Sequence, residues 1–118
     1  MRLFSQLSSV SQREVSNDGL DSENLADLEG IKLAFAAYDS LPEKDKRVKL
    51  AGFIASSDQL FFMNYCVGWC SKHASPGKHQ APYRSRCIVP LKNMPEFSQA
   101  FGCDAGTPMN PDEKCAFW

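Results

Sequence analysis

Apolar residues recur at three- and four-residue spacing along one stretch of the chain, namely at Leu28, Ile31, Phe35 and Tyr38. This spacing places them on one face of a helix. Asp21 or Ser22 can cap its start, and Pro42 disfavours helical backbone at the residue before it. The pattern therefore predicts an amphipathic helix that begins near residue 21 and ends before Pro42.

Two more helices are predicted further along the chain. The sequence Ser56-Ser57-Asp58-Gln59 is typical of a capping box and predicts a helix that continues through Cys70. Because this segment is apolar on nearly all sides, we expect it to be buried. A short third helix is predicted from about Pro95 to Gly102, since proline suits a first turn and glycine a helix end.

The segments between these helices predict irregular structure. Residues 1–18 are polar with little periodicity, so we expect a poorly ordered segment there, with one folded unit over residues 19–118. The charged run 43–50 predicts a solvated connection, and the prolines in 71–82 predict a loop. Residues 86–89 are expected to form a short extended segment. Residues 103–118 are predicted to be irregular and pinned by cysteines and Trp118, so the fold class is mostly α.

Charge and cysteine content narrow the class of protein. The net charge of −1 over 118 residues gives no electrostatic reason to expect nucleic acid or an anionic membrane as a partner. No secretory signal or apolar run of about 18 residues is present. Five cysteines indicate an oxidising compartment, and their odd number suggests a piece of a longer secreted or membrane-anchored ectodomain. A cytosolic protein with reduced cysteines and a small disulfide-stapled secreted domain are the alternatives.

Two carboxylates, Glu23 and Asp27, lie four residues apart in the first predicted helix and therefore share a face. They repel each other unless a cation or an arginine lies between them. A metal site would supply such a cation. The alternative is that acidic residues in a first turn simply complement the helix dipole.

Longer motifs extend this observation, and they are Glu-Asn-Leu-Ala-Asp, Leu-Phe-Phe-Met-Asn-Tyr-Cys-Val-Gly-Trp-Cys, Pro-Glu-Phe-Ser-Gln-Ala-Phe-Gly-Cys and Met-Asn-Pro-Asp-Glu-Lys-Cys-Ala-Phe-Trp. Together they resemble the C-terminal end of the neprilysin-type zinc metallopeptidases, from about Gly19 to Trp118. The resemblance implies a fragment of an α-rich peptidase domain. It also implies hydrolysis of peptide bonds by a water molecule that one zinc ion activates.

The resemblance assigns a role to each of four residues. Glu23 matches the third zinc ligand, and Asp27 matches the carboxylate that orients a ligating imidazole. His79 matches the histidine that hydrogen-bonds the oxyanion. Arg86 matches the arginine that binds a substrate carbonyl and is held by the carboxylate at Asp27. Because the segment from the histidine to the following leucine is one residue longer than the usual pattern, Arg84 is the alternative.

Other family features are missing from the sequence. It contains no His-Glu-x-x-His, and its two histidines, His73 and His79, are six residues apart and cannot form the i, i+4 pair of a zinc helix. The other zinc ligands would therefore belong to the remainder of the peptidase domain, outside this chain. We do not expect this polypeptide alone to hydrolyse peptides. The alternative function is a non-catalytic truncated paralogue that acts as a binding or decoy module.

The five cysteines divide into two groups under this resemblance. Cys70, Cys103 and Cys115 match family cysteines whose partners lie far upstream, so we expect them to be free here. Cys66 and Cys87 have no counterpart in the family pattern, and we expect a disulfide between them; a metal site at Cys66 and Cys70 is the alternative.

A further departure from the family is Glu29, which stands where a glycine is usual, just before Gly30. If close helix approach requires that glycine, Glu29 would perturb the packing beside the metal site.

Overall fold

The computed structural model describes residues 18–47, 49–70 and 83–115. Within these ranges it is helical, with no β-strand, which confirms the mostly α fold class. The described helices are α2 (Asp18–Asp39), α3 (Glu43–Lys46), α4 (Ser57–Val67), α5 (Tyr83–Lys92) and α6 (Pro95–Phe101). The predictions for residues 1–17, the loop at 71–82 and Trp118 fall outside the described residues. None of the described helices is both long enough and apolar enough to cross a membrane.

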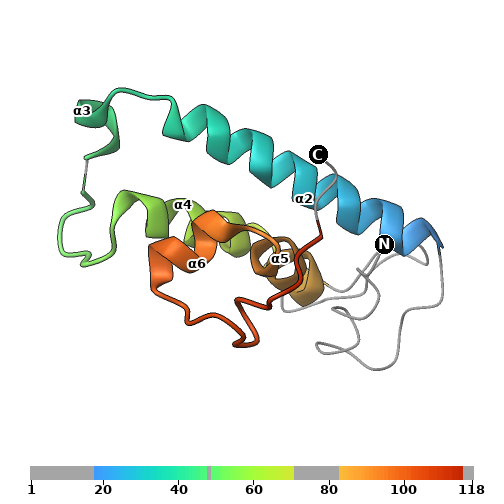
Figure 1. Cartoon of the computed structure of the whole chain (residues 1–118). Helices are drawn as coiled ribbons and strands as arrows, with labels where there is room; N and C mark the ends of the chain where they lie inside the picture. The colour runs from blue at the N-terminus through green and yellow to red at the C-terminus, as the bar shows by residue number, and fades with distance from the viewer. Residues whose placement is uncertain (1–17, 48, 71–82, 116–118) are drawn as a thin grey trace.

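Helix α2 is the longest of the described helices and packs mainly against α5, while α4, α5 and α6 pack against one another (Figure 1). Its apolar stripe is buried as predicted, with Leu28, Ile31 and Phe35 at most 8% exposed. The phenyl ring of Phe35 stacks on that of Phe62 from α4, with 5.1 Å between the ring centroids. These contacts form the centre of the core, and they fix the face of α2 that meets the shorter helices.

Helix α4 begins with the predicted capping box. The backbone N–H of Gln59 donates to the hydroxyl of Ser56 over 3.2 Å, and the backbone N–H of Ser56 donates to the side chain of Gln59 over 3.0 Å. The helix ends at Val67, before the predicted end at Cys70. Phe62 is its one buried residue, whereas Val67 is 63% exposed. The prediction of a fully buried helix is therefore wrong for the described residues, because α4 packs through one face against the core.

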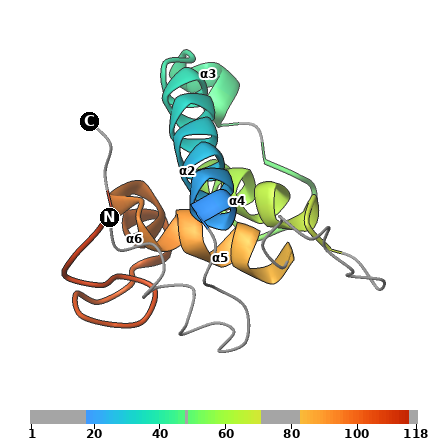
Figure 2. The same ribbon diagram turned by 90° about the vertical axis from the view of Figure 1, so that its right-hand side faces the viewer.

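Helix α5 replaces the short extended segment that we predicted for residues 86–89, so that prediction is wrong. The side chains of Ile88 and Val89 are β-branched and favour a strand when packing does not decide. In the folded chain Ser85, Val89 and Lys92 are buried at helical spacing. Figure 2 shows α5 crossing beneath the N-terminal part of α2, where the two helices are in contact. This packing overrides the local preference.

Helix α6 has the predicted ends, with Pro95 in its first turn and Gly102 in the left-handed conformation at φ 64°. The segment that follows is irregular, as predicted, over its described residues. The expected pinning by cysteines is absent there, since the thiols of Cys103 and Cys115 are free. The backbone N–H of Cys115 instead donates to the side-chain oxygen of Asn93 over 2.6 Å. A buried amide therefore anchors this segment in place of a disulfide.

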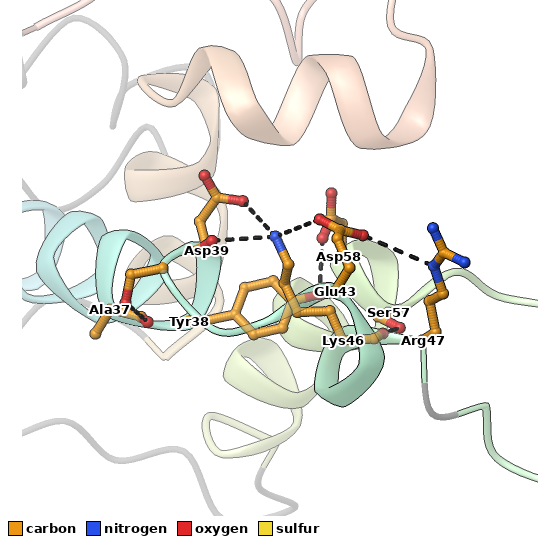
Figure 3. A network of polar contacts seen from close by, with 9 residues as sticks. Ala37, Tyr38, Asp39, Glu43, Lys46, Arg47, Ser57 and Asp58 are labelled. Carbon is orange, nitrogen blue, oxygen red and sulfur yellow. Dashed lines mark hydrogen bonds and ion pairs between the residues drawn. The ribbon is translucent and has the colours of Figure 1, made fainter.

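The charged connection between α2 and α4 is solvent-exposed, as predicted, although it contains the short helix α3. Figure 3 shows the ammonium group of Lys46 between two carboxylates, with distances of 3.2 Å to Asp39 and 3.0 Å to Glu43. Beside this network, the hydroxyl of Tyr38 donates to Asp58 over 2.8 Å. Burial and the bond to Asp58 raise the pKa of Tyr38 to about 12. These contacts join the end of α2 to the start of α4.

Candidate functional site

Glu23 and Asp27 lie on the face of α2 that meets α5, and both contact the guanidinium group of Arg86. The Nε and Nη2 atoms of Arg86 lie 2.8 Å from Oδ2 and Oδ1 of Asp27. The same Nη2 lies 3.2 Å from Oε2 of Glu23. The positive charge of Arg86 relieves the repulsion between the two carboxylates. The four-residue spacing of the two acids predicts a cation or an arginine at this place.

The two carboxylates differ in how many of their oxygens are already bonded to Arg86. Both oxygens of Asp27 accept from Arg86, and its side chain is 11% exposed. Glu23 is 40% exposed and uses one oxygen, so that Oε1 has no hydrogen-bond or ion-pair partner among residues 23–47, 49–70 and 83–115. The pair of parallel bonds is the stronger arrangement for a guanidinium and a carboxylate. Asp27 therefore holds Arg86, and Glu23 keeps an oxygen for another ligand.

Arg86 is also held from the side of α4. The Trp69 ring lies under the guanidinium group, with 4.0 Å between Cζ and the ring centroid. The hydroxyl of Tyr65 donates to the backbone oxygen of Arg86 over 2.6 Å. The hydrogen bond to Asp27 raises the pKa of Arg86, so the group stays charged.

The structure distinguishes the two candidate arginines by their contacts. Arg84 is exposed on α5 and makes no ion pair with any described residue, whereas Arg86 meets both carboxylates. His79 lies outside the described residues, so its position relative to this cluster stays a prediction.

The cysteines follow the sequence prediction. A disulfide joins Cys66 on α4 to Cys87 on α5, with 5.0 Å between the Cα atoms. The thiols of Cys70, Cys103 and Cys115 are free. Because Cys87 directly follows Arg86 in the sequence, the disulfide ties the residue next to Arg86 to α4.

Within the cluster of Glu23, Asp27 and Arg86, the one carboxylate open to a metal ion is that of Glu23. No group of three or more His, Cys, Asp or Glu side chains converges there in a way that could hold a metal. Asp27 is occupied by Arg86, and Glu23 has a partly exposed carboxylate with an open oxygen. These residues fit a single carboxylate ligand of a zinc ion and do not form a complete site.

The family model for peptidase family M13 matches residues 1–117. The chain belongs to peptidase family M13. It is 40% identical to Neprilysin-21 of Caenorhabditis elegans over 109 residues, which cover 81% of this chain and 14% of that protein. It is 33% identical to Neprilysin-1 of Trittame loki over 127 aligned residues, covering 97% of this chain and 18% of that protein. It is 35% identical to human Endothelin-converting enzyme 1, covering 93% of this chain and 15% of that protein.

This M13 chain thus spans less than a fifth of the length of these curated relatives. Membership in the family agrees with the resemblance that the motifs indicated. Two partners of Arg86, Tyr65 on α4 and Trp69 in the turn after it, are functional candidates that sequence reasoning missed. Pro90 was a usable signal, because a proline inside a helix leaves a carbonyl four residues earlier in need of a donor.

Glu29 is largely buried, and neither of its carboxylate oxygens has a hydrogen-bond partner among the described residues. Glu29 pairs with Lys32 over 3.6 Å on the same helix. A Cβ atom added at the neighbouring Gly30 would meet nothing within 4 Å among the described residues. The described packing therefore does not depend on a glycine at position 30.

Proposed function

We propose that this chain is the C-terminal portion of an M13 zinc metalloendopeptidase, which hydrolyses peptide bonds with a metal-activated water. The observation that carries the proposal is the cluster of Asp27, Glu23 and Arg86, in which Asp27 on α2 and Arg86 on α5 are 59 residues apart in the sequence. The remaining zinc ligands and the general base belong to the remainder of the peptidase domain.

Glu23 is the proposed third zinc ligand, because its carboxylate is partly exposed and keeps one oxygen open. When bound, a zinc ion in such a site polarises the scissile carbonyl and lowers the pKa of its water. Asp27 fixes the guanidinium of Arg86 and, by family resemblance, orients an imidazole ligand from outside this chain.

Arg86 is the proposed contact for a substrate carbonyl. Its bonds to the two carboxylates use Nε and Nη2, so within the described residues the two N–H groups of Nη1 are left for a substrate. His79 is proposed as the donor to the oxyanion on the strength of the family resemblance, and removal of such a donor raises the barrier by about 3 kcal/mol.

The setting of the parent protein is part of the same proposal. A disulfide between Cys66 and Cys87 supports an oxidising compartment, as for an extracellular or membrane-anchored ectodomain. Peptides are the proposed substrates, and the remainder of the peptidase domain is the proposed partner of this chain.

The test is a chimera in which this chain replaces the aligned C-terminal segment of human Endothelin-converting enzyme 1. We expect the purified chimera to cleave a fluorogenic peptide in the presence of zinc, and Glu23→Gln to lower kcat/KM by roughly a thousand-fold or more. The matched control is Glu96→Gln, which removes an exposed carboxylate on α6 and should leave activity unchanged.

Two outcomes would contradict the proposal. A chimera that folds but neither binds zinc nor cleaves peptide would favour the non-catalytic binding or decoy module. A Glu23→Gln variant as active as Glu96→Gln would remove Glu23 from the metal site.

A further inference from the structure

Three links from one segment hold Arg86 or its neighbour Cys87, and none of them involves the carboxylates of α2. They come from Tyr65, Cys66 and Trp69, on α4 and in the turn after it, and we call these three residues the α4 clamp. We propose that the α4 clamp is a positioning device for Arg86 in peptide hydrolysis. This inference rests on the proposed function of Arg86 and names the residues that set its geometry.

The first contact fixes the main chain of Arg86. Pro90 has no N–H, so the carbonyl of Arg86 loses the hydrogen bond that a helix would normally give it. The hydroxyl of Tyr65 replaces that donor over 2.6 Å. Burial, with the charge of Asp27, raises the pKa of Tyr65 to about 12, so the phenol stays a donor well into the alkaline range.

The second contact fixes the plane of the guanidinium group. The Trp69 ring covers one face of it at 4.0 Å, while Asp27 binds two of its nitrogens along one edge. A face and an edge together leave the planar group one orientation, in which Nη1 points away from Asp27. Trp69 is itself braced by Tyr65 and Tyr83, with ring centroids 6.3 Å and 6.0 Å away.

The third contact is covalent and limits how α5 can move along α4. Cys87 follows Arg86 directly, and its bond to Cys66 holds the two Cα atoms 5.0 Å apart. A shift of α5 that carried Arg86 away from Trp69 would also have to move this bond. The disulfide therefore restricts the position of Arg86. This restriction matters for catalysis because small misplacements of a substrate contact are costly in rate.

A double-mutant cycle in the chimera tests the clamp. We expect Trp69→Leu to lower kcat/KM roughly ten-fold when Arg86 is present and to have no further effect in an Arg86→Ala background. Trp69→Phe should recover part of the loss, since a phenyl ring still offers a π face. The control is Val67→Ala, an exposed residue at the end of α4 and two positions before Trp69, which should leave kcat/KM unchanged.

The second readout needs no activity and uses the chain labelled with ¹⁵N. The ring current of Trp69 should shift the Arg86 Nε–H signal upfield, and Trp69→Leu should return it toward the position of an exposed arginine. Tyr65→Phe and the double variant Cys66→Ala/Cys87→Ala should speed its exchange with water. An unshifted signal in the wild-type chain would overturn the clamp.

The two proposals fail in different ways. An equal loss from Trp69→Leu in both backgrounds of an active chimera would overturn the clamp alone, since a merely structural tryptophan does not act through Arg86. An inactive parent chimera would contradict the proposed function.

Discussion

Both oxygens of Asp27 lie 2.8 Å from nitrogens of Arg86, and these two bonds join α2 to α5 across 59 residues of sequence. They also separate the roles of the two acids on α2. Asp27 is committed to the arginine, whereas Glu23, 40% exposed, makes a single longer contact of 3.2 Å with it. The cluster therefore combines a fixed cation with one carboxylate that can accept a further ligand.

The paired bonds predict that lysine cannot replace Arg86. An ammonium group makes a point contact and loses the fork geometry, so we expect Arg86→Lys to lower the free energy of unfolding by roughly 1–3 kcal/mol. Urea titration of the chain measures this. The control is Arg84→Lys on the same helix, which is exposed and should change stability by less than about 0.5 kcal/mol. Equal losses in the two variants would contradict the importance of the fork.

The aromatic stack between α2 and α4 predicts a large effect at Phe62. This side chain is 1% exposed and stacks on Phe35, so Phe62→Ala should lower the free energy of unfolding by roughly 3–5 kcal/mol. Thermal and urea denaturation followed by circular dichroism give the value. Val67→Ala, at 63% exposure on the same helix, serves as the control and should stay within about 0.5 kcal/mol of wild type.

The raised pKa of Tyr65 predicts that the folded chain loses stability at alkaline pH. Its pKa rises to about 12 from 10.0, first because of burial and then because of the charge of Asp27. Since the folded chain favours the neutral phenol, this contribution is fully present below pH 10 and is lost as pH rises toward 12. Unfolding free energies measured from pH 9 to 12 should therefore fall more steeply for wild type than for Tyr65→Phe.

The control for this pH series is Tyr83→Phe, which removes a hydroxyl that has no hydrogen-bond partner among the described residues. It should keep the wild-type slope. Parallel curves for wild type and Tyr65→Phe would show that the Tyr65 phenol does not couple to folding.

Local signals predicted the helices whose ends and faces are encoded nearby in the sequence. The stripe at Leu28, Ile31 and Phe35 and the capping box at Ser56 need no tertiary information, and both were confirmed. The disulfide between Cys66 and Cys87 was also expected, because these two cysteines lacked counterparts in the family pattern.

Helix α5 could not be predicted in the same way. Its β-branched Val89 and its internal Pro90 argue against a helix locally, and contact with α2 decides the outcome. For the site, the family resemblance suggested that Arg86 meets the carboxylate of Asp27, which spacing alone could not do. The stacking of Trp69 on Arg86 depends on how two helices pack, and no short-range pattern carries that information.

The most direct test of the account is the zinc affinity of the chimera, measured by competition with a chelator and by metal analysis. We predict one zinc ion per molecule for the parent and for Glu96→Gln, and an affinity lower by roughly a hundred-fold or more for Glu23→Gln. Equal zinc affinities in all three proteins would contradict the claim that Glu23 is a metal ligand.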